Sequence, residues 1–409
     1  MNRTRNKNMS IKNNQQSYST GWILLLALLT SLGPLSIDMY LPALPQMAQD
    51  FNVSTQQISN TLPAYFLGLA VGQLFYGPLS DRIGRKKPLY FGISLYVVAS
   101  LLCVFAPDDW SLIFVRVLQA LGGCVGVVIA RAAIRDRLDL QSSAQAFSTM
   151  MIVMGVAPIT APIIGAFILK YFAWQAVFVT LTFIGLFFLI FVHFFFKETL
   201  APERRLKLSF KQITLLYGSI LADKSFRYPM LASCLTGAAL FSYISSASSV
   251  LMDHYHLNQQ LFAYAFGLNA FGIMLMSSLN KKLSNKMSVM SRLKLGALIQ
   301  VTGAVILVVA GLLNDAPLII VMIGLFLAIS GIGLTGPNAT ALAMSKQGSR
   351  AGTASAIMGS AQFVCGLVAG VLLNFLVWSE LLNMGLLMLI FIVSGLFMVM
   401  KVSKQINTG

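Results

Sequence analysis

The chain has 409 residues, of which 57% are hydrophobic and only 10% are Asp, Glu, Lys or Arg, and its formal net charge is +16. Ordinary soluble domains carry about 25% charged residues, so this composition excludes a disordered chain, a basic nucleic-acid-binding module and a normal soluble enzyme. A membrane-spanning helix needs about 20 mostly apolar residues, and the apolar content suffices for about twelve such helices.

Long apolar segments that are mostly free of charge recur along the whole chain, and each predicts one membrane-spanning helix. Their approximate ranges are 21–46, 58–79, 88–106, 110–131, 144–168, 174–196, 228–250, 260–280, 293–313, 317–344, 352–377 and 381–400. The sequence therefore predicts an all-α polytopic membrane protein with twelve transmembrane helices in two pseudo-symmetric six-helix bundles.

A weak internal repeat supports the division into two bundles. At an offset of 200 residues, Gly72 and Arg82 correspond to Gly272 and Lys282. A repeat at half the chain length is the arrangement known for alternating-access carriers. The predicted organisation is a tail over 1–20, a first bundle over 21–196, a linker over 197–227, a second bundle over 228–400 and a tail over 401–409.

The positive charges indicate an orientation in the membrane. If the amino terminus is cytoplasmic, 27 of the 29 Lys and Arg residues fall in cytoplasmic loops or tails, and the exceptions are Lys170 and Arg116. Such an excess of cytoplasmic Lys and Arg is the normal bias of membrane proteins. The net charge is therefore explained by topology beside a lipid bilayer, and no nucleic-acid partner is expected.

Cysteine and histidine give no sign of a metal site. The four cysteines lie inside predicted spans without paired spacing, which is typical of packing residues. They are Cys103, Cys124, Cys234 and Cys365. His254 and His256 flank Tyr255 in a predicted outer loop, where no further ligand set is close in sequence. We expect neither a disulfide nor a bound metal.

The loop between the second and third spans, residues 77–87, combines one acid with several cations. Its glycine permits a tight reversal between helices, and its carboxylate can pair with a nearby Arg or with the positive amino end of another helix. We interpret the loop as a latch that two rigid bundles could form and break, and the alternative is a topogenic loop with an incidental acid. The candidate gating residues are Gly77, Asp81, Arg82, Gly84 and Arg85.

Asp38 and Arg116 are the clearest ionisable residues within the apolar spans. Such residues cost about 2.5 to 3.5 kcal/mol each at a helix centre and usually mark proton or substrate paths. Counted from the outer ends of their spans at 1.5 Å per residue, both lie about 9–15 Å deep, so they could interact directly or through water. We interpret Asp38 as a reversibly protonated acid and Arg116 as its electrostatic modulator. The alternative for both residues is a purely structural pairing.

Two further sets of residues are weaker candidates. Small side chains on the fifth span would let another helix approach closely, and the residues concerned are Ala157, Ala161, Pro162 and Gly165. Polar side chains on other spans could line a wet substrate cavity, although each could equally form a helix-packing hydrogen bond. The cavity candidates are Tyr65, Gln119, Asn338 and Gln362.

Several stretches resemble known motifs. Residues 77–87 resemble the G-x-L-a-D-r-x-G-r-k-x loop of the major facilitator superfamily. Asp38–Pro45 resembles the D-x-y-L-P-x-x-P signature that ends the first span of Bcr/CflA-type drug:proton antiporters. Residues 116–122 resemble the R-x-x-q-G motif of span four, with Ala120 in place of glycine, and residues 157–166 resemble the antiporter motif of span five.

This resemblance implies a carrier that exports small amphiphilic molecules or drugs in exchange for protons, by alternating access. Protons would be the coupling ion, and no cofactor is expected. The implied protein is a functional monomer in the bacterial cytoplasmic membrane, with both termini cytoplasmic. The alternative is a proton-coupled metabolite transporter of the same fold, importer or exporter, with no role in drug resistance. An enzyme is not expected, because the G-x-x-x-x-G-K-[ST], G-x-S-x-G and H-E-x-x-H motifs are missing.

Overall fold

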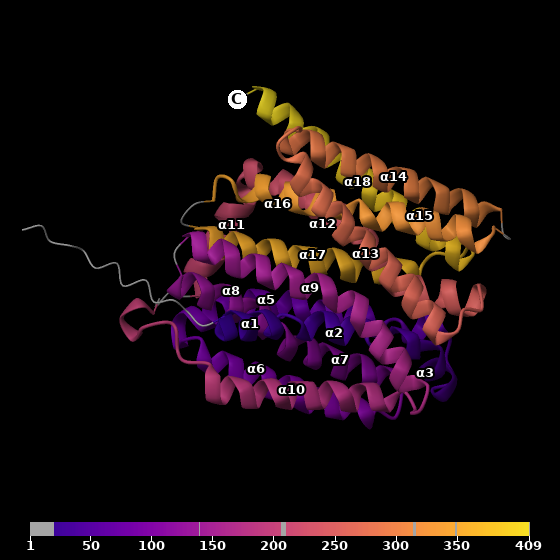
Figure 1. Cartoon of the computed structure of the whole chain (residues 1–409), viewed down its shortest axis with the longest axis horizontal. Coiled ribbons are helices and arrows are strands. Elements are labelled where there is room, and N and C mark those ends of the chain that lie inside the picture. The colour runs from indigo at the N-terminus through magenta and orange to yellow at the C-terminus, as the bar shows by residue number, and fades with distance from the viewer. Residues whose placement is uncertain (1–19, 139, 206–209, 314–315, 348–349, 409) are drawn as a thin grey trace, which may run out of the picture.

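The computed structural model describes residues 20–138, 140–205, 210–313, 316–347 and 350–408, and every regular element in these ranges is a helix (Figure 1). The predicted tail over 1–20 lies, except for Thr20, outside the described residues. The first half contains α1 (Thr20–Leu29), α2 (Leu32–Asp38), η1 (Leu41–Ala43), α3 (Leu44–Asp50), α4 (Thr55–Ile58), α5 (Thr61–Ile83), α6 (Lys86–Val104), α7 (Asp109–Gly123), α8 (Val125–Arg137), α9 (Leu140–Leu169), α10 (Gln175–Phe195) and η2 (Pro202–Arg204). The second half contains α11 (Phe210–Ala222), α12 (Lys224–Ser248), the π-helical turn η3 (Ser249–His254), α13 (Gln259–Leu283), α14 (Val289–Leu312), α15 (Leu318–Ser330), α16 (Ile332–Met344), α17 (Ala351–Leu373) and α18 (Glu380–Thr408).

The predicted fold class is confirmed. Within the described residues, ten helices are long and apolar enough to cross a membrane. The first predicted span is present as a pair of segments, Gly21–Leu29 and Leu32–Asp50, bent by 41°. The fifth is α9, whose described apolar part is Val153–Leu169. The chain is therefore an all-α polytopic membrane protein.

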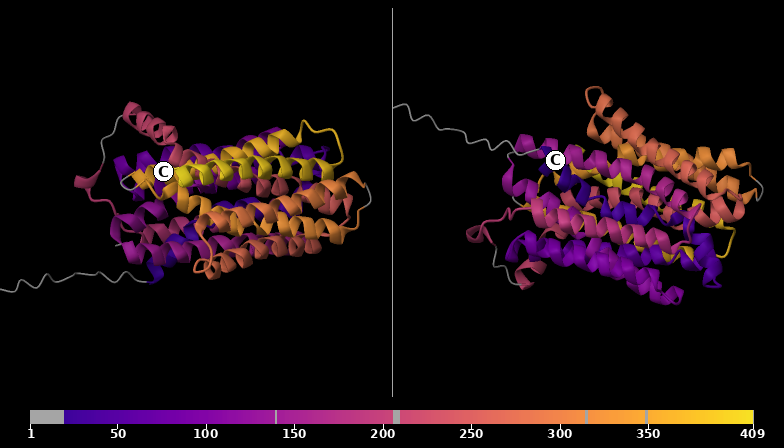
Figure 2. Two further views of the ribbon diagram at one scale, coloured as in Figure 1. Left: turned by 90° about the horizontal axis from the view of Figure 1, so that it is seen from above. Right: turned by 60° about the horizontal axis from the view of Figure 1, so that its bottom comes forward.

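The helices pack in two groups that follow the chain order. In the first group α6 packs between α7 and α10, and α9 packs against α1 and α2; in the second, α18 packs against α12 and α14. Figures 1 and 2 show the first half in indigo to magenta and the second in orange to yellow, with the helices roughly parallel. The halves meet where α5 packs against α17 and α9 against α13. We call this interface the seam.

The parallel helices give the molecule two ends. The basic end carries Arg85, Arg135 and α11, and it is also where α1 begins and α18 finishes, on the left of Figure 1. The opposite end carries Trp174, whose indole N–H donates to Asp50 Oδ2 at 2.7 Å.

Two hydrogen bonds join the halves near the opposite end. Ser248 Oγ on α12 donates to the carbonyl oxygen of Leu41 in η1 at 2.8 Å, and Asn374 Nδ2 donates to Asn60 Oδ1 at 2.6 Å. The short elements α3 and η1 also pack against η3 and α13. The seam is therefore closed by packing and hydrogen bonds at this end.

The first span is broken next to Pro34, which has no N–H group to donate to the carbonyl oxygen of Thr30. At the end of α1, Ala27 O accepts the backbone N–H of Thr30 at 3.1 Å, and Leu28 O accepts that of Ser31 at 3.0 Å. The hydroxyls add to this turn, since Thr30 Oγ1 donates to Ala27 O at 2.6 Å and Ser31 Oγ donates to Leu28 O at 2.7 Å. The sequence predicted one continuous helix over 21–46, and the break places Asp38 at the end of the short helix α2.

Two segments expected to be loop or tail contain regular helix. The linker over 197–227 includes α11, and the tail over 401–409 includes the last turns of α18. The Lys401 ammonium group lies 5.5 Å from the ring centroid of Tyr228 and 4.6 Å from that of Phe397. These cation–π contacts help to explain why α18 continues beyond its apolar part.

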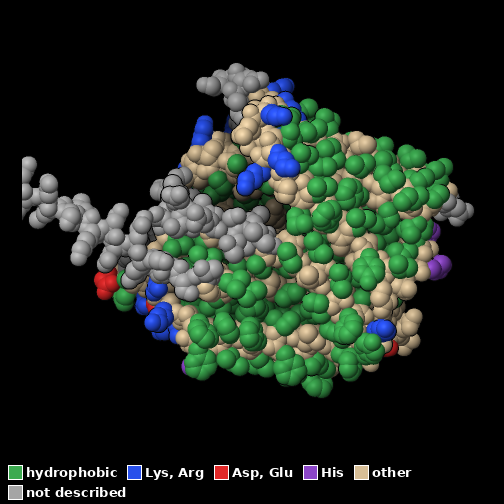
Figure 3. Space-filling view, in the orientation of Figure 1, with side chains coloured by type: hydrophobic (Ala, Val, Ile, Leu, Met, Phe, Trp, Pro, Cys, Tyr) green, Lys and Arg blue, Asp and Glu red, His purple; other side chains and the backbone are tan. Residues whose placement is uncertain are grey.

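The surface around the middle of the molecule is apolar. Large side chains such as Phe105, Phe114 and Phe183 are more than 60% exposed. Figure 3 shows hydrophobic side chains covering most of one face, whereas Lys and Arg gather near the basic end. Such a wide exposed apolar surface fits contact with lipid chains and would be a liability in water.

Candidate functional site

Arg116 on α7 is completely buried inside the first half. Its Nη2 donates to the carbonyl oxygen of Ser36 at 3.0 Å, and its Nη1 donates to Gln119 Oε1 at 2.5 Å. The guanidinium carbon also lies 4.4 Å from the ring centroid of Tyr40 and 4.2 Å from that of Tyr65. These contacts compensate a desolvated cation by hydrogen bonds and cation–π attraction.

Asp38 is the last residue of α2 and is only 3% exposed. The ion pairs of the described residues join Arg85 to Asp81 and to Asp136, so Asp38 and Arg116 do not pair directly. The Asp38 carboxyl group instead interacts electrostatically with Tyr243 on α12, in the other half. The buried acid is therefore placed at the seam and not at the guanidinium.

Arg116 is connected to Asp38 indirectly, because its guanidinium binds the backbone of the first span near that residue. The carbonyl oxygen that it binds belongs to Ser36, two residues before Asp38. The Ser36 hydroxyl lies 2.7 Å from the Tyr96 hydroxyl of α6, which holds the same turn from another side. Arg116 therefore fixes the turn that carries the acid.

The small residues of the fifth span bring α9 against this same turn. Ala157 and Ala161 are buried, as is Pro162. A side chain at Gly165 would collide with the carbonyl oxygen of Met39, the residue that follows Asp38. The predicted antiporter helix and the predicted proton-coupling acid are thus in direct contact through the backbone, which the sequence did not indicate.

The four predicted cavity residues do not form one surface. Tyr65 and Gln119 surround Arg116 in the first half, and Gln119 Nε2 also donates to Ser100 Oγ at 2.8 Å. Asn338 lies inside the second half, where its Nδ2 donates to Asn280 Oδ1 at 2.8 Å. Gln362 on α17 is half-buried. Tyr65, Gln119 and Asn338 thus contact neighbouring side chains, and their role as cavity residues stays a prediction.

The predicted gating loop is partnered within the first half. Arg85 donates to Asp81 Oδ1 at 2.5 Å, to Ser80 Oγ at 2.7 Å and to Asp136 Oδ2 on α8 at 2.8 Å. The Arg135 guanidinium on α8 lies against Gly352 at the start of α17, across the seam. In this arrangement the carboxylates bind the loop, and the halves touch through Arg135 and through Tyr217 of α11, whose hydroxyl donates to Leu74 O at 3.3 Å.

The rest of the loop is held by Glu198, which follows α10. Its carboxylate accepts backbone N–H bonds from Arg85 at 2.9 Å and Lys86 at 3.1 Å, at the amino end of α6. Gly84 has a φ of +94°, a value that favours glycine, and a side chain there would meet the same carboxylate. Of the remaining candidates, Arg82 is exposed and Gly77 faces open space.

The second half also holds a buried guanidinium, on α14. Arg292 Nη1 on α14 donates to Asn280 Oδ1 at 2.8 Å and to the carbonyl oxygen of Asn280 at 3.1 Å. At an offset of 200 residues Asn280 corresponds to Ser80 and Lys281 to Asp81, so the second half has no carboxylate at the position of Asp81.

Glu198 gives the basic end a defined response to acid. Its pKa is below the ordinary glutamate value of 4.5, because four backbone N–H donors outweigh the burial that would raise it. The contribution of ionised Glu198 to the free energy of unfolding is therefore complete above pH 4.5, and it is lost as the pH falls through the lowered pKa. We expect the melting temperature of the purified chain to drop below about pH 4.5. Glu198→Gln should flatten the dependence of the melting temperature on pH, whereas the control Glu203→Gln should leave it unchanged. Equal curves for the two variants would contradict the role of Glu198.

Several residues that shape the site were not identified from the sequence. In the sequence Asp136 is an ordinary acidic residue near the end of a predicted span, and only the structure shows that it binds Arg85. Tyr243 is one of 12 tyrosines, and only the fold places it opposite Asp38. A recognisable signal was nevertheless present in the serine-rich run 242–249, because so many hydroxyls in one apolar span are unusual.

A buried acid at the seam of two similar helical bundles defines a class of protein, the polytopic membrane carrier. The Major Facilitator Superfamily matches residues 26–370. The chain belongs to this superfamily of transporters and is not an enzyme.

Three relatives match most of the chain. It is 33% identical to an uncharacterised MFS-type transporter, YdgK of Bacillus subtilis, over 86% of this chain and 87% of that protein. It is 30% identical to a bicyclomycin resistance protein homologue of Haemophilus influenzae, over 87% and 89%. It is 29% identical to the multidrug resistance protein MdtL of Klebsiella pneumoniae, over 92% and 94%.

Solved structures confirm the fold. A D-xylose–proton symporter matches with a TM-score of 0.73 at 15% identity, over 93% of this chain and 97% of that one. A bacterial homologue of the human lysosomal transporter Spinster, in an inward-facing and occupied conformation, matches with a TM-score of 0.69 at 15% identity, over 94% and 96%.

Proposed function

We propose that this protein is a proton-coupled antiporter that exports small amphiphilic molecules or drugs across the bacterial cytoplasmic membrane by alternating access. The observation that carries the proposal is Asp38, a buried acid at the end of a broken helix, opposite Tyr243 of the other half. A carboxyl group at such a seam can take up a proton in one arrangement of the halves and release it in the other. The drug-resistance names of two relatives support the direction of transport.

We further propose that the basic end faces the cytoplasm and that the protein works as a monomer. The positive-inside rule supports this orientation, because the loops at Arg85, Arg135 and Lys281 all lie at that end. In the proposed cycle the Asp81 loop keeps the basic end of the first half rigid, and Arg135 meets α17 across the seam.

The proton gradient is a sufficient energy source. One charge that crosses 100 mV releases about 2.3 kcal/mol. That energy supports a roughly 40-fold concentration ratio at about 1.4 kcal/mol per decade. Exchange of one proton for one neutral molecule would therefore lower the internal drug concentration enough to change susceptibility.

A susceptibility panel tests the proposal. Expression in an efflux-deficient bacterium should raise the inhibitory concentration of at least one of bicyclomycin, chloramphenicol and ethidium. A protonophore should abolish the protection, because the gradient drives the export. Unchanged susceptibility to the whole panel, together with proton-dependent uptake of a metabolite, would favour the alternative of a metabolite transporter with the same fold.

A further inference from the structure

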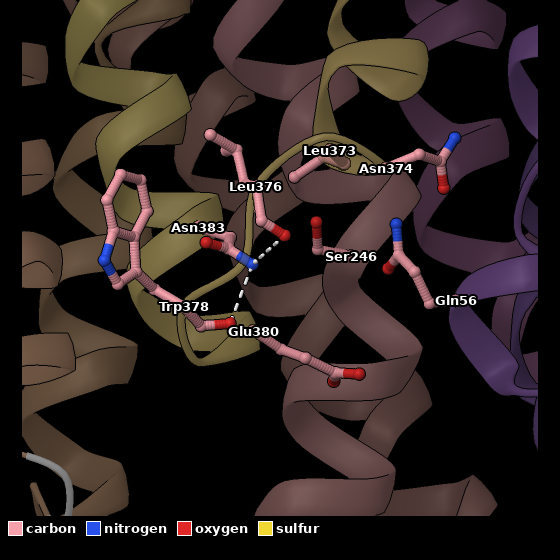
Figure 4. Close-up of a pocket in the computed structure, with 8 residues that line it drawn as sticks. All are labelled: Gln56, Ser246, Leu373, Asn374, Leu376, Trp378, Glu380 and Asn383. Atoms are coloured by element: carbon pink, nitrogen blue, oxygen red, sulfur yellow. Dashed lines mark hydrogen bonds between the residues drawn. The ribbon is translucent and has the colours of Figure 1, made fainter.

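A polar pocket of about 240 Å³ lies at the opposite end of the molecule, beside the seam (Figure 4). One lining residue, Gln56, comes from the first half, and the others come from the second half. The lining residues are Gln56, Ser246, Leu373, Asn374, Leu376, Trp378, Glu380 and Asn383. The pocket is thus a small polar chamber next to the contacts that close this end.

Two buried polar groups in the pocket lack a partner within the protein. Ser246 is 2% exposed and Asn383 is 7% exposed. Neither Ser246 Oγ nor Asn383 Oδ1 has a hydrogen-bond partner among the described residues. In Figure 4 the Ser246 hydroxyl points between Leu376 and Asn374, toward the interior of the pocket. Buried polar atoms of this kind are normally satisfied by water in a polar cavity.

The same pocket holds a carboxyl group with an acidic neighbour. Glu380 lines the pocket and interacts electrostatically with Asp253 of η3. Its carboxyl group also lies beside the Ser249 hydroxyl, and Asp253 in turn is near Thr55 and His256. Two close acids raise the local concentration of protons and other cations.

Hydroxyl groups continue from this acidic pair into the protein along α12. Ser249, Ser246 and Ser245 are all buried, and none of their hydroxyls has a hydrogen-bond partner among the described residues. Asp253, Ser249 and Ser246 share one helix face at spacings of four and three residues. Tyr243 lies about 15 Å from the acidic pair along the axis, at 1.5 Å per residue. Its hydroxyl already accepts a hydrogen bond from Asn269 Nδ2 at 3.0 Å.

We propose that this face of α12 is the route by which protons from the opposite side reach Asp38, from the Glu380–Asp253 pair through the serine hydroxyls and their water to Tyr243. The inference rests on the proposed role of Asp38. A hydronium ion gives its proton to a Glu380 carboxylate oxygen. Each hydroxyl or water then accepts a proton on a lone pair and releases its own to the next oxygen. The final O–H bond forms on Asp38, so one proton is moved and nothing else changes.

This route explains how the end closed to substrate can still admit protons. The bonds from Ser248 to Leu41 and from Asn374 to Asn60 close the seam to larger molecules, whereas a row of hydroxyls passes only protons. The last step, from Tyr243 to Asp38, crosses the seam. Movement of one half against the other would therefore bring Tyr243 and Asp38 together and separate them again. This separation prevents a continuous proton leak.

The first test needs no substrate. The full chain in lipid nanodiscs is exposed to hydroxyl radicals, which modify side chains next to water, and modification of Tyr243 is measured. Tyr243 is only 1% exposed, so its labelling would report internal water. Ser245→Ala with Ser246→Ala should reduce the labelling rate severalfold. Ser233→Ala is the matched control, because Ser233 is also buried on α12 with an unpartnered hydroxyl but lies ten residues before Tyr243, outside the route. Parent-level labelling in the double variant would overturn the route.

The second test separates the route from the function. In proteoliposomes an acid jump on the opposite side drives exchange of the panel drug that gives the largest resistance. Glu380→Gln and the double serine variant should slow this exchange about tenfold, and Ser246→Thr, which keeps a hydroxyl, should not. Drug-induced proton release in detergent should stay normal in the slow variants, because Asp38 is intact. Parent-like exchange in them would overturn the route, whereas a parent chain that releases no proton would overturn the proposed function.

Discussion

Asp38→Asn is expected to abolish proton-driven transport while the chain still folds and inserts. Asparagine has nearly the same size as aspartate but cannot exchange a proton in this range. No ion pair is lost, since Asp38 does not pair with Arg116 among the described residues. The change should therefore remove the coupling chemistry and leave the packing of α2, η1 and α9 in place.

The measurement is drug-induced proton release from the purified protein and from inverted vesicles. The Asp38→Asn signal should fall to that of empty vesicles, with a melting temperature close to that of the parent. Asp38→Glu keeps an exchangeable carboxyl group and should retain partial coupling. Undiminished proton release from Asp38→Asn would remove this residue from the mechanism.

Arg116→Gln is expected to lower both stability and transport. The substitution takes donors from Ser36 O and Gln119 Oε1, both buried, and an unsatisfied buried group costs about 1–3 kcal/mol. It also removes the cation that stacks on Tyr40 and Tyr65. Arg116→Lys should be intermediate, because a compact ammonium group cannot reproduce the planar fork.

A scaffold role and a coupling role for Arg116 give different results. If the charge of Arg116 acts on Asp38, the pH dependence of transport should shift in Arg116→Gln, even for variants matched in stability. We expect an upward shift, because loss of a positive charge favours a protonated carboxyl group. Gln119→Ala, which loosens Arg116 without removing its charge, serves as the control. Lower stability with an unchanged pH profile would leave Arg116 as scaffold alone.

The sequence predicted the spans well because a lipid-facing helix must be apolar along its whole length. Hydropathy alone could not predict the break at Thr30 and Ser31, because it does not distinguish a bent apolar segment from a straight one, although Pro34 is a sequence signal for the break. Hydroxyl side chains that satisfy the backbone at the break carry almost no hydropathy signal. The division of α15 from α16 at Gly331 was missed for the same reason.

The candidate site was predicted in part. Asp38, Arg116 and the loop around Asp81 stood out, because charge in an apolar segment is conspicuous. Their partners did not stand out, because partner choice depends on which helix faces lie together. Counting residues along two helices gave the depths of Asp38 and Arg116 in the membrane but not the directions in which their side chains point. The depth therefore suggested a direct pair, whereas the side chains belong to different contacts.

The contact between Gly165 and Met39 has a consequence for how the protein is made. The first span contains Pro34, Pro42 and Pro45, and α9 contains Pro158 and Pro162, so both helices have freed backbone carbonyls that neighbours must satisfy. The contact of Gly165 with Met39 is available only after 126 further residues have been synthesised, which takes roughly 6–25 s at about 5–20 residues per second. During that interval the first span must wait in the bilayer or the translocon without its permanent neighbour. A bulky residue at Gly165 would therefore affect biogenesis first, because the chain would be degraded before its helices assemble. The loss would appear as a lower amount of protein in the membrane.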